Sequence, residues 1–207
     1  MMIDFDILWP KYGIKPAGVL HLGANTGQEA EVYERHGVKD VVWVEAIPAV
    51  FEQLAKHVEK YGHTCVLACV GDEEGKEVEF NISNNESQSS SYLDLAHHKV
   101  IHPTVDYIGK FKTTIRRIDN MIHLQPYLGD WFLNADLQGA ELPAFKGMGN
   151  LLGGFKWVYT EVNKRETYKG CALIEEVDEY LAEFGFVRVE TGQWVGDTWT
   201  DALYIKS

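Results

Sequence analysis

The chain has 207 residues, of which 45% are hydrophobic, 12% aromatic and 24% charged. This composition is typical of globular proteins, and the length suits a single core, so we predict one domain over residues 1–207. The 31 acidic residues outnumber the 19 lysines and arginines, which gives a net charge of −12. A surface of that charge repels phosphate backbones, which argues against a nucleic-acid partner.

Cysteine usage and hydropathy indicate a soluble, cytoplasmic protein. The chain has an odd number of cysteines, namely Cys65, Cys69 and Cys171. The first two lie in an apolar run typical of a buried strand, where cysteine acts as a small hydrophobe. A disulfide framework is therefore not expected, and the reducing interior of a cell fits best. The N-terminal segment lacks the basic start and apolar run of a signal peptide. No stretch approaches the roughly 18 apolar residues of a membrane span, so we expect no membrane partner.

The first seventy residues alternate strands and helices. Short apolar runs end near Gly23 and at Glu45, as buried strands do before a turn. Thr26 and Glu29 have capping-box spacing, which predicts that a helix begins at Thr26. Pro48 suits the first turn of the next helix. In chain order, we predict a strand at 17–22, a helix over 26–36, a strand at 41–45, a helix from 48 onward and a strand at 64–70.

The middle of the chain departs from this alternation. Residues 71–83 predict a turn and a strand whose Val78, Phe80 and Ile82 share one face, a hairpin inserted where a simple repeat would place a helix. Residues 85–112 are polar, serine-rich and aperiodic, so we expect a mobile loop with one short helix. Loops of this length in compact domains are often lids, so this segment is the expected acceptor-binding lid.

The second half of the chain returns to alternating elements. We predict strands at 112–117, 131–136, 155–162, 186–190 and 199–206, with helices over 118–124, 140–147 and 172–184. Strand–helix alternation implies a parallel sheet covered by helices on both faces. The last two strands have no helix between them. We therefore predict an α/β, Rossmann-like fold, with a mostly parallel seven-stranded sheet and an antiparallel C-terminal edge hairpin.

The first predicted strand leads into the sequence HLGANTGQ, at the edge where such sheets bind ligands. Gly23 and Gly27 allow a sharp turn and a close approach to a ligand, but Ala24 and Asn25 replace the middle glycine that admits a pyrophosphate. This spacing argues against NAD, and alone it also fits an ordinary tight turn. Glu45 ends the second strand about 20 residues later, where it can accept both ribose hydroxyls. Turn and acid together indicate an adenosine ligand.

Two further acids end neighbouring strands, Asp136 after the fourth core strand and Glu161 on the fifth. A carboxylate here could act as general base on a substrate hydroxyl, or the pair could bind a divalent metal such as Mg²⁺ or Mn²⁺. The alternative is structural, with Asp136 and Glu141 capping the next helix. A functional role is favoured for Asp136. Two carboxylates at adjacent strand ends raise each other's pKa, and placing them there without a function would destabilise the fold.

The order of these residues resembles one family. HLGANTGQ, VEA, ACVGDEEGKEVEF, TIRRID, NADLQGAELPAFKGM and VYTEVNKRETYKG together are similar to the FkbM-type methyltransferases, from about Val19 to Phe186. The resemblance implies a class I methyltransferase fold, S-adenosyl-L-methionine as donor, and methylation of a hydroxyl on a small molecule, often a sugar or glycan. An N- or protein-side-chain methyltransferase and a non-catalytic adenosine-binding module remain open, as does the oligomeric state.

The resemblance also implies roles for single residues. On the donor side these are His21, Gly23, Ala24, Asn25, Gly27, Glu45, Ala46, Asp72 and Asp136, the last facing the transferring methyl group. The expected acceptor contacts are Ser90, Ser91 and Tyr92 from the serine-rich segment, together with Tyr168. Many family members carry an acid at the position of His21. The histidine could hydrogen-bond the donor or a neighbouring carboxylate, or it could be a core residue.

Overall fold

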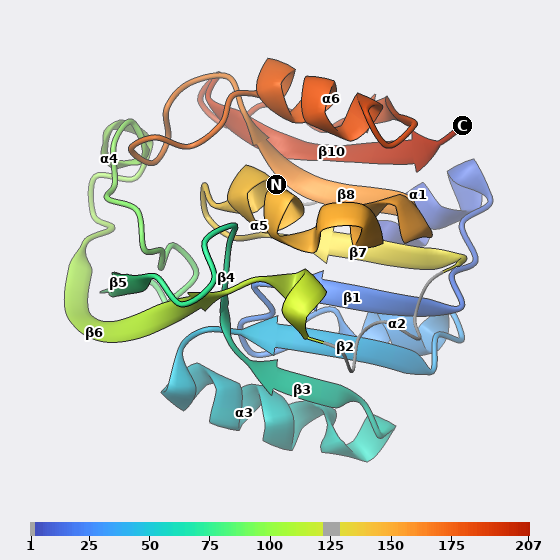
Figure 1. Cartoon of the computed structure of the whole chain (residues 1–207), viewed down its shortest axis with the longest axis horizontal. Helices are drawn as coiled ribbons and strands as arrows, with labels where there is room; N and C mark the ends of the chain where they lie inside the picture. Colours follow the sequence, from blue (N-terminus) through green and yellow to red (C-terminus); the bar gives the residue numbers. More distant parts are fainter. Residues whose placement is uncertain (1–2, 122–128) are drawn as a thin grey trace.

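The computed structural model describes residues 3–121 and 129–207. Its main strands are β1 Gly18–Leu22, β2 Asp40–Glu45, β3 Thr64–Leu67, β7 Trp131–Ala135, β8 Phe155–Asn163, β9 Phe186–Thr191 and β10 Trp199–Lys206. They form one sheet in the order β3-β2-β1-β7-β8-β10-β9 (Figure 1). β10 is antiparallel to β8 and β9, and β3, β2, β1, β7 and β8 are parallel. The predicted Rossmann-like sheet with its antiparallel edge pair is thereby confirmed.

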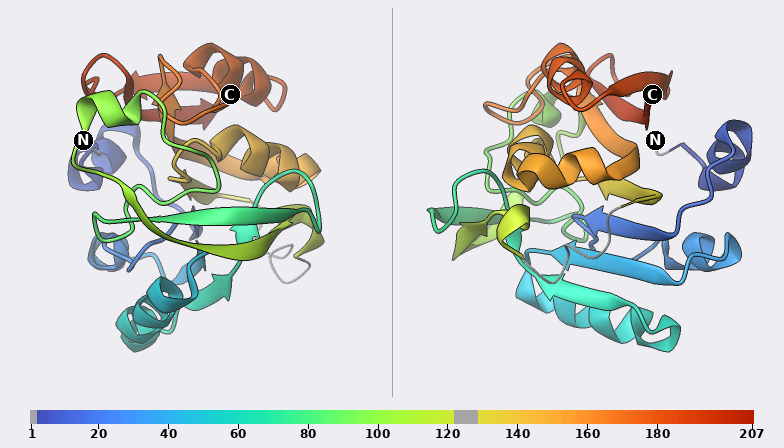
Figure 2. Two further views of the ribbon diagram at one scale, coloured as in Figure 1. Left: turned by 90° about the vertical axis from the view of Figure 1, so that its left-hand side faces the viewer. Right: turned by 45° about the vertical axis from the view of Figure 1, so that its right-hand side comes forward.

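Helices cover both faces of this sheet (Figure 2). The helices on one face are α1 Phe5–Tyr12, α2 Ala30–Arg35 and α3 Pro48–Val58, and those on the other are α5 Glu141–Met148 and α6 Ile174–Ala182. Short 3-10 helices lie in the connections between the main elements, namely η1 Glu59–Tyr61, η2 Ile118–Asn120 and η4 Gly149–Gly154. Within the ranges 3–121 and 129–207, no helix has the length and apolar character needed to cross a membrane.

The central strands are buried on both sides because of these two helical layers. All five residues of β1 and all five of β7 are buried, as expected for parallel strands inside an α/β sheet. β1 pairs in register with β2 on one side and with β7 on the other. The carboxyl ends of the three strands therefore meet at one edge, and the residues at these ends, Gly23, Glu45 and Asp136, are brought together.

A second, three-stranded sheet stands where the repeat would place a helix. It consists of β4 Cys69–Val70, β6 Tyr107–Arg116 and β5 Glu77–Ser83, in the order β4-β6-β5. The predicted strand at 64–70 is thus two strands in two sheets, divided at Ala68. The predicted hairpin is also wrong in its pairing, because β4 and β5 both pair with β6 and not with each other. The alternation of apolar and polar residues predicts which side chains of a strand share a face, but it does not predict with which other strand that strand pairs.

Several predicted boundaries shift. The helix expected from Thr26 begins only at Ala30, with Glu29 as its N-cap and no side-chain capping bond. The capping box is therefore wrong, because the Thr26 amide instead donates to Asn25 Oδ1 at 2.7 Å. The strand expected at 112 begins at Tyr107. The helix expected over 118–124 is only the η2 turn as far as it can be described, since residues 122–124 lie outside the described residues.

Candidate active site

A cavity of about 470 Å³ lies at the carboxyl ends of β1, β2, β7 and β8. Most of the predicted site residues line it, namely His21, Gly23, Ala24, Asn25, Glu45, Ala46, Ser90, Tyr92, Asp136, Glu161 and Tyr168. The fold therefore joins residues from five separated parts of the sequence around one space. Gly27, Asp72 and Ser91 are not among the lining residues.

The three outlying residues have structural contacts instead. Gly27 has a φ of +78°, and a Cβ added there would lie 2.8 Å from a leucine side chain of α3. The Asp72 carbonyl accepts a 2.9 Å hydrogen bond from Arg117. Ser91 exchanges backbone hydrogen bonds with Asn81 of β5. The chain around each of these three residues thus reaches the cavity through neighbouring residues.

Gly23 permits the close approach of β1 and the segment after β7. Its φ is +77°, and a Cβ added at this position would lie 1.8 Å from the carbonyl oxygen of Asp136. The Asp136 amide in turn donates to the Leu22 carbonyl at 3.0 Å. No residue with a side chain fits in this conformation without a backbone shift. Gly23 is therefore required by its contact with the backbone of Asp136. The need for a tight turn alone does not explain a glycine at this position.

Glu45 ties the glycine turn to the end of β2. Its side chain is buried, with Oε2 accepting from the Asn25 amide at 2.9 Å and Oε1 from the Ile47 amide at 2.8 Å. Burial is the main cause that raises the pKa of Glu45 to about 7, against the opposing effect of these amides. The carboxylate also lines the cavity. Its remaining acceptor capacity suits the hydroxyl donors of a ribose.

Asp136 and Glu161 lie close together, with the side chain of Gln138 between them. The Gln138 amide donates to Asp136 Oδ1, and it approaches Glu161 Oε2 at 3.4 Å. The Tyr168 hydroxyl donates to the carbonyl oxygen of the same amide. Gln138 has a φ of +53°, a strained conformation for a residue with a side chain. Gln138 could be singled out from the sequence only by its place in the DLQGAE motif, because its bridging position depends on this backbone conformation.

The two carboxyls share a raised pKa but differ in exposure. Asp136 is open to the cavity, yet the surrounding protein atoms desolvate it and raise the pKa of its carboxyl. Glu161 is buried, and burial followed by the negative charges of Glu141 and Asp136 raises its pKa well above the usual range. Ala140, not Asp136, is the N-cap of α5, so the capping alternative is wrong for Asp136. Glu141 does have a structural role, because its carboxylate accepts hydrogen bonds from the backbone amides of Leu137 and Gly139.

The lining of the cavity is acidic. Its lining contains four carboxyls, Glu29, Glu45, Asp136 and Glu161, and no lysine or arginine of the described chain. Of the basic side chains that line it, burial lowers the pKa of His21 to about 3 and that of His98 to about 4. A cation is therefore favoured in this space, and an anion is repelled.

A metal at Asp136 and Glu161 gains no support from the geometry. Among the described residues, no group of three or more histidine, cysteine, aspartate or glutamate side chains is placed to hold a metal ion. The amide nitrogen of Gln138, a donor that cannot ligate a cation, occupies the space between the two carboxylates.

The serine-rich segment packs over the cavity. Backbone amides of Ala96, His97 and His98 donate to the carbonyls of residues 166 and 167, and Lys169 donates to Asp94. The segment also carries α4 His98–Ile101, at the upper left of Figure 1. His98 is buried, its Nε2 lies 3.1 Å from Ser89 Oγ, and its ring contacts that of Tyr168. Residues 107–112 of the expected loop belong to β6.

Sheet order and cavity position together define a Rossmann-like protein of the class I methyltransferase architecture. The family model described as "Methyltransferase FkbM domain" matches residues 21–188. The chain therefore belongs to the FkbM methyltransferase family and is an S-adenosylmethionine-dependent methyltransferase. A search of curated proteins found no match.

Solved structures share this fold at low sequence identity. Magnesium protoporphyrin IX methyltransferase from Synechocystis PCC 6803, solved with the donor bound, is 10% identical with a TM-score of 0.53, covering 97% of this chain and 74% of that one. A candidate tRNA (m1A22) methyltransferase from Streptococcus pneumoniae, also donor-bound, is 14% identical with a TM-score of 0.52, covering 100% and 73%. A candidate RNA methyltransferase from Pyrococcus horikoshii is 14% identical with a TM-score of 0.51, covering 97% and 80%. The names of these three proteins indicate different methyl acceptors, so the similarity to this chain concerns the fold alone.

Proposed function

We propose that the protein transfers the methyl group of S-adenosyl-L-methionine to a hydroxyl of an uncharged small molecule, such as a sugar or a glycan. The observation that carries this proposal is the position of Asp136, a carboxylate open to the cavity and held by Gln138. A cavity of about 470 Å³ falls within the range of small-molecule sites. Its acidic lining suits a cationic donor.

The residues present fit the donor. Gly23, Ala24 and Asn25 would hold its methionine end, and Glu45 with Ala46 its ribose, since the Glu45 carboxylate offers acceptors at the cavity wall. When bound, the donor supplies an electrophilic methyl group on a sulfonium. The residues of the chain would orient the acceptor, and such alignment supplies roughly 7–11 kcal/mol of the rate acceleration.

Asp136 is the general base in this proposal. Its carboxylate takes the proton of the acceptor hydroxyl, and desolvation raises its pKa toward the range in which a base works near neutral pH. Gln138 keeps the carboxylate in place through its amide, and Tyr168 fixes Gln138 from the other side. Glu161 lies behind Gln138 and is a positioning residue.

The acceptor side of the described lining is polar and contains no lysine or arginine. Its polar and aromatic residues include Asn85, Ser87, Gln88, Ser89, Ser90 and Tyr92 from the segment 84–106, with Trp199 from β10. Hydroxyl and amide groups suit a polyhydroxylated acceptor. A phosphorylated acceptor or a nucleic-acid backbone meets four carboxyls and no lysine or arginine in the described lining. We therefore propose that the segment 84–106 is the acceptor lid and that nucleic acid is not the substrate.

The test is the variant Asp136→Asn, with Asp197→Asn as an exposed control paired to Lys164 on the surface. Formation of S-adenosylhomocysteine is followed with a panel of neutral sugars, their phosphates and amines. Asp136→Asn should keep donor affinity and lose about 10²–10⁴-fold in turnover on a neutral hydroxylated acceptor. Unchanged turnover would remove Asp136 from the mechanism. Methylation of amines alone would favour N-methylation, and donor binding without any product would favour a non-catalytic module.

A further inference from the structure

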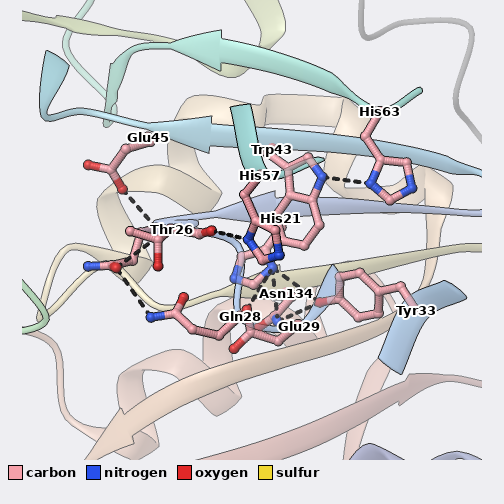
Figure 3. A network of polar contacts seen from close by, with 11 residues as sticks. His21, Thr26, Gln28, Glu29, Tyr33, Trp43, Glu45, His57, His63 and Asn134 are labelled. Carbon is pink, nitrogen blue, oxygen red and sulfur yellow. Dashed lines mark hydrogen bonds and ion pairs between the residues drawn. The ribbon is translucent and has the colours of Figure 1, made fainter. Parts of the chain in front are cut away.

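Glu29 lies directly after the glycine turn, at the start of α2, and faces the cavity. Its Oε2 is 3.9 Å from Nδ1 of His21, a buried residue of β1 (Figure 3). Both residues line the same cavity as Gly23 and Asn25. The contact joins an acid and a histidine at the position where a ligand would meet the turn.

His21 does not neutralise this acid. Its Nδ1 lies 3.2 Å from the Tyr33 hydroxyl and 3.4 Å from Asn134 Nδ2. Asn134 Nδ2 also donates to the Tyr33 oxygen at 2.8 Å, which directs the Tyr33 hydrogen to His21. An amide nitrogen can only donate, so Nδ1 is an acceptor and the imidazole proton is on Nε2. Burial lowers the pKa of His21 to about 3, which keeps the ring neutral.

Among the described residues, Glu29 faces no positive charge. Its side chain is 13% exposed, and the titratable groups that face it are the neutral His21, the phenol of Tyr33 and the like-charged Asp136. Across the described chain, no lysine or arginine pairs with it. Burial first, and then Asp136, raise the pKa of Glu29 to about 7. A secluded carboxylate without a cation is unfavourable unless a ligand supplies one.

We propose that Glu29 is the anionic ligand of the α-ammonium group of the bound donor. This inference rests on the proposed function, which puts the methionine end of the donor at the glycine turn. The donor carries two cationic groups, but only the ammonium has N–H bonds to donate to a carboxylate. His21, Tyr33 and Asn134 form a neutral, hydrogen-bonded wall beside Glu29 and act as positioning residues.

Three ligands separate this role from its alternatives. S-adenosylmethionine and S-adenosylhomocysteine both carry the ammonium group, the sulfonium belongs to the first alone, and 5′-methylthioadenosine has neither. Binding is measured by calorimetry at pH 8, where Glu29 is mainly ionised. Glu29→Gln should weaken both amino-acid ligands equally, by about 10–100-fold as for a charged hydrogen bond, and should leave 5′-methylthioadenosine unchanged. Glu31→Gln, an exposed acid of α2, is the matched control and should alter no affinity.

Each other result overturns the proposal. No loss in Glu29→Gln means that Glu29 does not bind the donor. Equal loss for all three ligands means a structural role, and loss for S-adenosylmethionine alone means that the sulfonium is recognised. Thermal unfolding of the variant verifies its fold, which the isosteric amide should preserve. If the wild-type protein binds neither amino-acid ligand, the proposed function itself fails, and the inference about Glu29 fails with it.

Discussion

Replacing Gly23 with alanine tests whether the glycine turn serves the site or only the chain direction. Gly37→Ala is the matched control, because Gly37 has nearly the same φ, +78° against +77°, but nothing within 4 Å of an added Cβ. The left-handed conformation costs both variants about 1–2 kcal/mol. At Gly23 the new Cβ would also lie 1.8 Å from the Asp136 carbonyl oxygen. Moving that backbone should add about 1–3 kcal/mol.

The assay is thermal or urea unfolding of both variants, followed by calorimetry with S-adenosylmethionine. In a chain of this size, 1 kcal/mol shifts Tm by about 2–4 °C. Gly23→Ala should therefore lower Tm several degrees more than Gly37→Ala, and it alone should lose donor affinity, because Asp136 and the turn are pushed apart. Equal losses of stability, or unchanged donor binding in Gly23→Ala, would refute the close packing of β1 against the segment after β7.

Two further predictions concern the buried polar groups. Burial raises the pKa of Glu29, Glu45 and Glu141 from 4.5 to about 7, so the folded protein binds more protons than the unfolded chain between these values. The free energy of unfolding should therefore rise as pH falls from 8 to 6, by about 1.4 kcal/mol for Glu29 alone; urea unfolding that shows a fall would contradict the burial of these acids. Gln138→Leu leaves the carboxyl of Asp136 and the hydroxyl of Tyr168 without this partner, which should lower stability by about 1–3 kcal/mol and reduce turnover. Turnover equal to wild type would show that Gln138 does not position Asp136.

Local patterns predicted the main sheet, because each of its strands is a short apolar run bounded by a turn. The acids at the strand ends followed from the same pattern, since parallel strands present their carboxyl ends at one edge. The helix α1 was missed, although Asp4 caps it and Gly13 ends it in a left-handed conformation. Both signals are present in the sequence, but Pro10 lies inside the helix, and a proline within a segment argues against a helix there.

Contacts between distant segments could not be predicted from local patterns. The split of residues 64–70 depends on the pairing of Cys69 with Ile115, 46 positions further along the chain. The bridging role of Gln138 and the seclusion of Glu29 arise only when β1, β7 and β8 are assembled. The serine-rich segment has no periodicity of its own, and its position comes from hydrogen bonds to residues 166–169.

The cavity at the strand ends should bind S-adenosylmethionine. Calorimetric titration of the wild-type protein with S-adenosylmethionine, S-adenosylhomocysteine and NAD measures this binding. We expect micromolar binding of the two sulfur ligands and none of NAD, because Ala24 and Asn25 occupy the turn where a pyrophosphate would need glycine. Binding of NAD, or no binding of either sulfur ligand, would show that the cavity is not a site for S-adenosylmethionine.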